Sequence, residues 1–142
     1  MRKRQSQEES VHVQIAAYIR MQYPDVIFTS ESSGIRVPMH LAVMMKKQRS
    51  AHKQPDMIIL EPKGIYHGLI LEIKKDQSEV YLKDGSISKS KHIQDQLKTL
   101  CLLTDKGYYA HFACGFDECK HLVDWYMNYE NQDLQTKNKG IK

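Results

Sequence analysis

Two apolar runs decide how this chain folds: Pro55-Asp56-Met57-Ile58-Ile59-Leu60 and Leu69-Ile70-Leu71-Glu72-Ile73-Lys74. The residues between them, 61–68, include a proline and two glycines, which are turn signals, so the runs predict the two strands of a β-hairpin. Such a hairpin sets Asp56 beside Glu72. Because side chains two positions apart on a strand share a face, Glu72 and Lys74 point the same way, about 7 Å apart.

Asp56 and Glu72 are therefore two neighbouring carboxylates, which repel each other. A divalent cation between them removes the repulsion, and hard oxygen ligands of this kind suit Mg²⁺ or Mn²⁺. The pair predicts a metal site with Lys74 beside it. Taken alone, the acid-x-lysine triplet also fits a solvated charge pair on an exposed strand.

These residues resemble the signature of the PD-(D/E)XK nucleases, and their surroundings resemble the VRR-NUC branch found in phage and repair nucleases. The resemblance extends from Glu8 to about Tyr129. Besides the hairpin it includes an acidic first helix ending in Tyr23-Pro24, a helix carrying Gln96, Gly107-Tyr108-Tyr109-Ala110, and Gly115-Phe116-Asp117-Glu118. The chain departs from the family at 50–54, where a glycine-containing stretch is common and Ser-Ala-His-Lys-Gln stands instead.

The resemblance implies Mg²⁺- or Mn²⁺-dependent hydrolysis of DNA phosphodiester bonds. Asp56 would bridge the metal or metals, Glu72 would bind one, and the backbone carbonyl of Ile73 would supply a further oxygen. Lys74 would position the attacking water, help to deprotonate it and stabilise charge on the phosphate. One-metal and two-metal versions of the site both fit these residues.

Two further residues join the site by resemblance. Gln96 would position the water or the substrate phosphate, and it borders the apolar stripe of its helix; a surface glutamine is the alternative. Glu8, or its neighbour Glu9, would add an acidic metal ligand from the first helix. Acids in a first turn are favourable for the helix dipole in any case, which is the other explanation of Glu8.

Periodicity along the chain predicts one α/β domain over 1–129 and a polar tail over 130–142. The expected order is αβαββαβα with a mixed central sheet flanked by helices, which resembles the restriction-endonuclease-like fold. We expect helices at 7–22, 38–47, 88–104 and 116–129, and strands at 26–29, 57–60, 69–74 and 108–114. In the second helix we expect Met44 and Met45 to fill the core.

Composition allows a nucleic-acid partner without demanding one. The 142 residues are 27% charged and 41% hydrophobic, and the net charge is +4. Basic residues are clustered, and five of them are predicted to contact the DNA backbone: Lys46, Lys47, Lys53, Lys89 and Lys91. Solvated surface charge is the alternative explanation of such clusters.

The chain shows neither an apolar leader nor a stretch long enough to span a bilayer, so we expect no membrane association. Its three cysteines are an odd number without a disulfide-framework spacing, which fits a reducing compartment. We therefore expect an intracellular, cytoplasmic protein, and the resemblance implies a bacterial cell or a phage-infected host.

Two other functions compete with the nuclease prediction. One is a nucleic-acid-binding module of the same fold that no longer cuts. The other is a zinc-stabilised interaction domain, whose ligands would be His111, Cys114, Cys119 and His121. The spacing disfavours zinc, because the first pair would stand on opposite faces of a strand and the second pair about 200° apart around a helix. We expect the cysteines to be core residues.

The residues leave the shape of the substrate open, because phosphate contacts carry no sequence information and no base-reading helix is recognisable. Stand-alone VRR-NUC proteins that resemble this chain act on branched DNA. A two-fold junction is matched by a symmetric dimer with two sites. The resemblance therefore implies a homodimer that prefers four-way or flapped DNA to linear duplex.

Overall fold

The computed structural model describes residues 7–31 and 37–129, with side chains from Ser10 onward. Its elements are α1 (Gln7–Gln22), β1 (Phe28–Ser30), α2 (Met39–Lys47), β2 (Met57–Ile59), β3 (Leu69–Lys74), the 3₁₀ helix η1 (Gln77–Glu79), α3 (Lys91–Asp105), β4 (Tyr109–Cys114) and α4 (Gly115–Met127). The predicted order αβαββαβα is confirmed, although β1 begins two residues later than expected. The predicted tail at 130–142 lies outside the described residues.

The four strands form one mixed sheet in the order β1-β2-β3-β4. The predicted hairpin is confirmed: β2 and β3 are antiparallel, with Met57 opposite Leu71 and Ile59 opposite Leu69. Carried one residue further, this register sets Asp56 across from Glu72. Strand β4 pairs parallel to β3 on its other side, and helix α3 makes the crossover between them.

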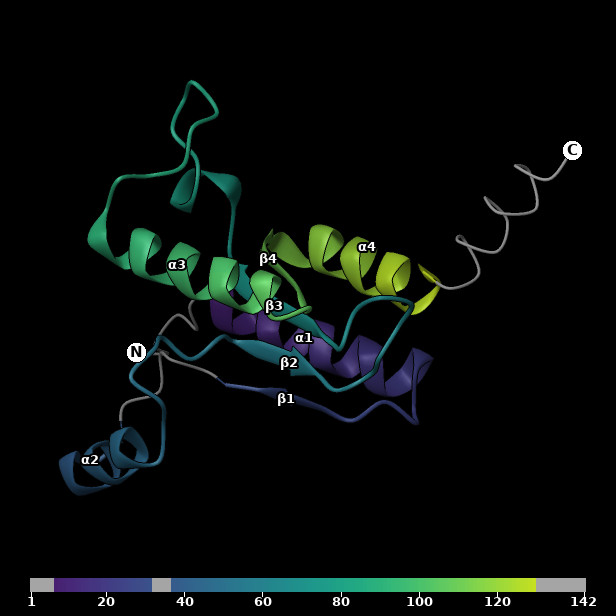
Figure 1. Cartoon of the computed structure of the whole chain (residues 1–142), viewed down its shortest axis with the longest axis horizontal. Helices are drawn as coiled ribbons and strands as arrows, with labels where there is room; N and C mark the ends of the chain where they lie inside the picture. The colour runs from purple at the N-terminus through teal and green to yellow at the C-terminus, as the bar shows by residue number, and fades with distance from the viewer. Residues whose placement is uncertain (1–6, 32–36, 130–142) are drawn as a thin grey trace, which may run out of the picture.

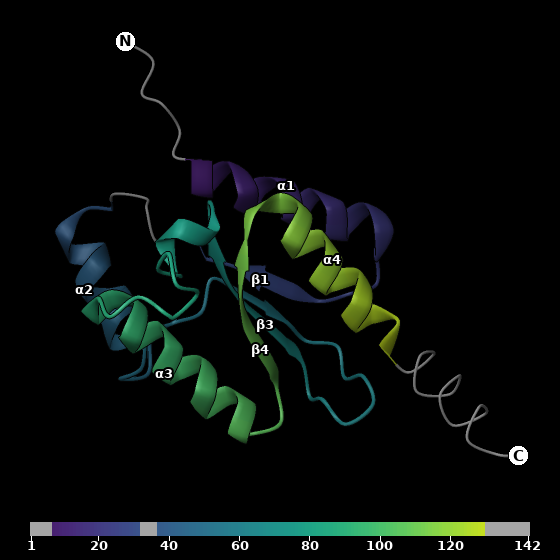
Figure 2. The same ribbon diagram turned by 90° about the horizontal axis from the view of Figure 1, so that it is seen from above.

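Helices cover both faces of the sheet, with α1 and α4 on one face and α3 on the other (Figures 1 and 2). All six residues of β3 are buried as a result. Leu69, Leu71 and Ile73 pack into the core beneath α1 and α4, whereas Ile70 packs into the core beneath α3. Because strand side chains alternate, Glu72 shares the α3 face with Ile70.

The ends of α3 are set by local sequence. Ser90 is the N-cap, and its Oγ accepts a hydrogen bond from the backbone N–H of Ile93 at 3.3 Å. After the helix, Gly107 has a φ of +97°, and a Cβ there would lie 2.6 Å from the His67 ring, so only glycine fits. These two ends place the buried face of α3 over β4, with Gln96 reaching Glu72 of β3.

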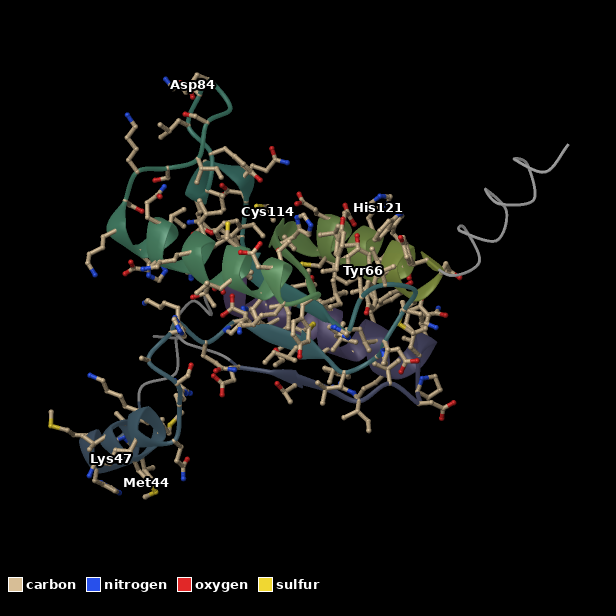
Figure 3. All side chains as sticks on the ribbon, viewed as in Figure 1. Met44, Lys47, Tyr66, Asp84, Cys114 and His121 are labelled. Carbon is tan, nitrogen blue, oxygen red and sulfur yellow. The ribbon has the colours of Figure 1, made fainter. Side chains whose placement is uncertain are left out.

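Helix α2 does not pack as predicted. None of its residues is buried, and Met44 and Met45 remain 49% and 38% exposed instead of filling the core. The helix lies at a corner away from the sheet, and Figure 3 shows Met44 and Lys47 there. The prediction was wrong because apolar residues on a helix indicate that the helix can pack against a partner, but they do not identify the partner.

On the other side of the molecule, α1 and α4 are joined through Asp124. Its Oδ1 accepts hydrogen bonds from the hydroxyls of Tyr18 at 2.6 Å and Tyr23 at 2.7 Å, and its Oδ2 pairs with the Lys120 ammonium at 3.0 Å. Burial opposes ionisation of Asp124, but these three donors outweigh it and lower the pKa of the carboxyl. Nothing in the described part of the chain is a helix long and apolar enough to cross a membrane.

Candidate active site

The β2–β3 hairpin brings the three predicted site residues together. Asp56, Glu72 and Lys74 are only 3%, 4% and 5% exposed. The carboxylate Oδ2 of Asp56 accepts a hydrogen bond from the backbone N–H of Ile73 at 2.8 Å, which locks the acid against the neighbouring strand. Burial rules out the alternative of a solvated charge pair on an exposed strand.

Gln96 reaches the same place from α3. Its Nε2 donates a hydrogen bond to Glu72 Oε1 at 2.7 Å, so it lies at the site and is not the surface glutamine of the alternative interpretation. Its Oε1 is buried, and among the described residues it has no hydrogen-bond donor. Buried polar atoms are nearly always paired, so this oxygen marks a position where a donor such as a bound water belongs.

Lys74 is buried, yet among the described residues it forms no ion pair. Its charge acts on His92 at the start of α3: burial lowers the pKa of that imidazole, and the positive charges of Lys74 and Lys53 lower it further. The Nζ of Lys53 lies 3.4 Å from His92 Nδ1. The described residues therefore offer Lys74 no acidic partner, and the basic side chains of His92 and Lys53 lie near it.

The first helix contributes a residue that the sequence interpretation missed. His12 is 6% exposed; its Nδ1 lies 3.4 Å from Ser30 Oγ, and its Nε2 lies 3.9 Å from Asp56 Oδ2. A signal was present, because His12 precedes Ile15 by three residues and Ile19 by seven, which puts all three on one helix face.

The remaining predicted ligands are placed only in part. Glu8 and Glu9 lie in the first turn of α1, and their side chains fall outside what the structure describes. The side chain of Ile73 is buried in the core opposite Glu72, and its N–H is taken by Asp56. A metal role for the Ile73 carbonyl and for Glu8 stays a prediction.

Hard divalent ions fit the residues present. Within residues 10–31 and 37–129, no three His, Cys, Asp or Glu side chains already converge to hold an ion. Mg²⁺ and Mn²⁺ do not need such a cage, since one or two carboxylates with water and substrate oxygens suffice. Asp56 and Glu72 provide those carboxylates, and the unsatisfied Gln96 Oε1 can accept from a bound water.

The alternative zinc site is not formed. His111, Cys114, Cys119 and His121 are all described, and they make no metal-binding group. Cys114 and His121 lie well apart along the segment from β4 to α4 (Figure 3). Burial raises the pKa of the Cys114 thiol to about 11 and that of Cys119 to about 12, which disfavours the thiolate that zinc requires. Cys119 is a core residue, as predicted, whereas Cys114 is only half-buried and Cys101 is exposed, so the prediction of core cysteines was wrong for Cys101.

A basic hollow of about 560 Å³ opens between the end of α2 and the side of α3. Its basic lining residues are Lys46, Arg49, His52, Lys53 and Lys98. Lys98 was missed by the sequence interpretation, because it stands alone in the chain and joins the others only when α3 packs. Asp95 also lines this hollow, but Asp56 and Glu72 do not. The contact between Lys53 and His92 connects it to Lys74.

The other three predicted DNA contacts do not line the hollow. Lys47 follows at the end of α2, while Lys89 and Lys91 lie at the start of α3, and all three are exposed. Lys91 pairs with Asp95 one turn along α3, with Nζ and Oδ2 3.1 Å apart. These lysines add exposed positive charge at the end of α2 and the start of α3.

Topology, mixed sheet and flanking helices define the restriction-endonuclease-like class of α/β fold. The fold is similar to the solved structure of a protein described as a VRR_NUC domain protein, with a TM-score of 0.59 and 23% sequence identity. The likeness covers 89% of this chain and 92% of that one, and at this identity it concerns the fold. No protein-family model matches the chain, and a search of curated proteins finds no match.

Proposed function

We propose that this chain is a metal-dependent nuclease that hydrolyses DNA phosphodiester bonds inside the cell. The observation that carries the proposal is the meeting of Asp56, Glu72 and Lys74 in one buried place at the end of the hairpin. Two acids and a lysine can hold a divalent ion, a water and a phosphate together. The fold likeness to a VRR_NUC domain protein supports the same activity.

Each residue would have a defined part in the reaction. Asp56 and Glu72, with the carbonyl of Ile73, would hold Mg²⁺ or Mn²⁺, which lowers the pKa of bound water and offsets charge on the phosphate. Lys74 would orient the attacking water, help to remove its proton and stabilise the phosphate oxygens. Gln96 would keep Glu72 in place through Nε2 and accept from the water through Oε1.

Cleavage by alanine variants tests this assignment. Asp56→Ala, Glu72→Ala and Lys74→Ala should each abolish cleavage while the far-ultraviolet circular dichroism stays native. Asp84→Ala is the matched acid control, because Asp84 lies on a distant exposed loop (Figure 3) and bonds only to nearby Ser86 among the described residues. Wild-type rates in folded Asp56→Ala or Glu72→Ala would refute the assignment and favour a binding module that does not cut.

Gln96→Ala should lower the cleavage rate about tenfold, less than loss of a carboxylate, because it removes a positioning contact and no metal ligand. Gln94→Ala on the outer face of the same helix is its matched control and should leave the rate unchanged. Equal losses in the two variants would show that α3 as a whole was disturbed.

Cleavage should need Mg²⁺ or Mn²⁺, stop with EDTA and resume when either ion is restored. Ca²⁺ should not support it, because its longer and looser coordination positions water poorly. Activity that survives exhaustive chelation would contradict the proposed chemistry.

The basic hollow would bind the DNA backbone. Replacing Lys46, Lys47 and Lys53 by glutamine should weaken binding to all DNAs and flatten the dependence of affinity on salt, without changing the preferred DNA structure. Replacing Lys89 and Lys91 should have the same kind of effect, reduced by the pairing of Lys91 with Asp95. Lys83→Gln, beside Asp84 on the distant loop, is the matched control.

A homodimer acting on branched DNA is the finer part of the proposal, and α2 supports it. Nine residues are too few for a stable isolated helix, and none of those in α2 is buried. Its exposed apolar side chains are Met39, Leu41, Val43, Met44 and Met45. Met39 and Val43 lie on one side of this helix, and Leu41, Met44 and Met45 lie on the other. An exposed helix with this much apolar surface is typical of a protein interface, and a second copy of the chain would cover it by two-fold pairing.

Sedimentation velocity tests the dimer. Val43→Asp together with Met44→Asp should convert a dimer into a folded monomer, whereas Met21→Asp, at a more exposed methionine of α1, should not. The wild-type protein should cut four-way or flapped DNA faster than linear duplex. The monomeric variant should lose this preference while it still cuts DNA. A wild-type monomer that cuts linear duplex equally fast would refute the dimer and leave the nuclease chemistry standing.

A further inference from the structure

Helix α1 contacts the site through His12, a residue that the sequence interpretation did not include. We infer that His12 is a metal ligand through Nε2, and that the site therefore discriminates in favour of Mn²⁺ over Mg²⁺. The inference rests on the proposed metal site at Asp56. It adds a nitrogen ligand to a set made otherwise of oxygen atoms.

The separation of the two side chains suits one shared ion. His12 Nε2 lies 3.9 Å from Asp56 Oδ2, which is too long for a direct hydrogen bond. Ligand atoms that are each about 2.1 Å from one ion lie roughly 3 Å apart at right angles and about 4 Å apart across it. The observed distance exceeds that of a hydrogen bond and is close to the distance between two ligands on opposite sides of one ion.

Ser30 holds the other side of the imidazole ring. Its Oγ lies 3.4 Å from His12 Nδ1, at the end of β1. A hydroxyl can accept as well as donate, so Ser30 can take the Nδ1–H and leave the lone pair of Nε2 facing Asp56. Histidine ligands ordinarily have their second nitrogen held in this way, which fixes the tautomer and the direction of the ring.

An ordinary core histidine explains the surroundings less well. The other buried residues of α1, Val11, Ile15 and Ile19, are aliphatic side chains. A polar ring in this row lowers stability unless polar groups compensate for its burial. The polar groups around it include the Ser30 hydroxyl and the Asp56 carboxylate, so the ring is directed to the site.

An imidazole ligand changes which metals bind well. Oxygen-only sites suit Mg²⁺ and Ca²⁺, whereas a nitrogen donor raises the affinity for transition metals, Mn²⁺ included. No three candidate side chains in the described residues converge beforehand. Water must therefore complete the shell, and a single nitrogen donor has a correspondingly large influence on the choice of metal.

The test measures metal binding by the full chain without DNA. Electron paramagnetic resonance of free Mn²⁺ gives its Kd, and calorimetry gives the Kd of Mg²⁺. His12→Gln keeps a polar side chain of similar reach but removes the nitrogen donor, and it should raise the Kd of Mn²⁺ about tenfold or more. The Kd of Mg²⁺ should change by less than about threefold. His121→Gln, on the exposed face of α4, is the matched control.

A spectroscopic signature separates ligation from a structural role. Pulsed paramagnetic resonance of bound Mn²⁺ should show coupling to an imidazole nitrogen in the wild-type protein and in His121→Gln, and none in His12→Gln. Ser30→Ala should keep the coupling but weaken Mn²⁺ binding, because the ring loses its support. If His12→Gln fails to fold, the wild-type spectrum decides by itself.

The outcomes distinguish this inference from the proposed nuclease. Mn²⁺ bound in an Asp56-dependent way without nitrogen coupling would overturn the role of His12 and leave the metal site intact. An equal loss of Mn²⁺ and Mg²⁺ affinity in folded His12→Gln would overturn it as well. Nitrogen coupling in a protein that cuts no DNA would support His12 as a ligand and refute the nuclease. A protein that binds neither ion would refute both.

Discussion

Two buried or half-buried aspartates, Asp124 and Asp56, lie on different sides of this molecule and have different hydrogen-bond partners. The Asp124 side chain is 30% exposed and receives two tyrosine hydroxyls and a lysine ammonium. The Asp56 side chain is only 4% exposed, and its described hydrogen-bond donor is a neutral backbone N–H. His12 Nε2 lies 3.9 Å from its Oδ2, beyond hydrogen-bond distance, so the more deeply buried acid has the weaker hydrogen-bond compensation.

The difference supports the proposed division, in which Asp124 stabilises the fold and Asp56 belongs to the proposed active site. A buried charge is unfavourable unless other groups of the chain balance it, and Asp124 is balanced. Asp56 lies beside a second acid, Glu72, near an amide oxygen of Gln96 that lacks a donor. Arrangements that the chain leaves unbalanced are typical of functional sites, where a metal or substrate supplies the rest.

The largest effect we expect is on the cleavage rate, which should depend on Asp56 and not on Asp124. Asp56→Asn should lower DNA cleavage by about a thousandfold or more, because a carboxylate metal ligand is lost. Asp124→Asn should keep at least about half of the wild-type rate per folded molecule, because Asp124 bonds to Tyr18, Tyr23 and Lys120. Rates are to be measured on one DNA at saturating Mg²⁺, and a comparable loss in both variants would contradict the division of roles.

Metal-induced stabilisation comes next in size. An ion at about one hundred times its Kd stabilises the folded state by about 2.7 kcal/mol if it binds only that state. Mn²⁺ should therefore raise the melting temperature of the wild-type protein and of Asp124→Asn, but not that of Asp56→Ala or Glu72→Ala. Calorimetry with and without Mn²⁺ makes the measurement. A full rise in Asp56→Ala would place the metal elsewhere.

In the absence of metal, the two aspartates should have opposite effects on stability. Asp124→Asn should lower the free energy of unfolding by about 1–2 kcal/mol, because hydrogen bonds to a partly exposed charge are weakened. Asp56→Asn should leave it unchanged or raise it, since one of two repelling carboxylates is removed. Urea unfolding in EDTA tests both, and strong destabilisation by Asp56→Asn would make that acid structural.

The smallest effect concerns pH. The pKa of Asp124 is lowered in the folded protein, so the unfolded chain binds the proton more readily. The stabilisation is therefore complete above the unfolded value near 3.8 and is lost as the pH falls through the lower, folded pKa. Unfolding curves between pH 5 and pH 2 should show this loss in the wild-type protein, and the curve for Asp124→Asn should be flatter. Parallel curves would contradict the lowered pKa.

Much of the fold and the centre of the site could be predicted from the sequence, because they depend on short-range regularities. A period of two places Glu72 and Lys74 on one face of a strand, and turn residues bring Asp56 across from them. Helical periodicity assigned Gln96 to the edge of a buried face, where it bonds Glu72. Order and approximate bounds of the elements followed from the same patterns.

Only the tertiary structure decided the rest, because it depends on contacts between segments that no local period connects. His12 meets Asp56 from a position 44 residues earlier in the chain, and Tyr18 meets Asp124 across 106 residues. The exposure of α2 has the same cause. Its apolar residues are evident from the sequence, but the sequence does not show that no described segment covers them. Periodicity determines which side of an element is apolar, whereas packing determines what that side touches.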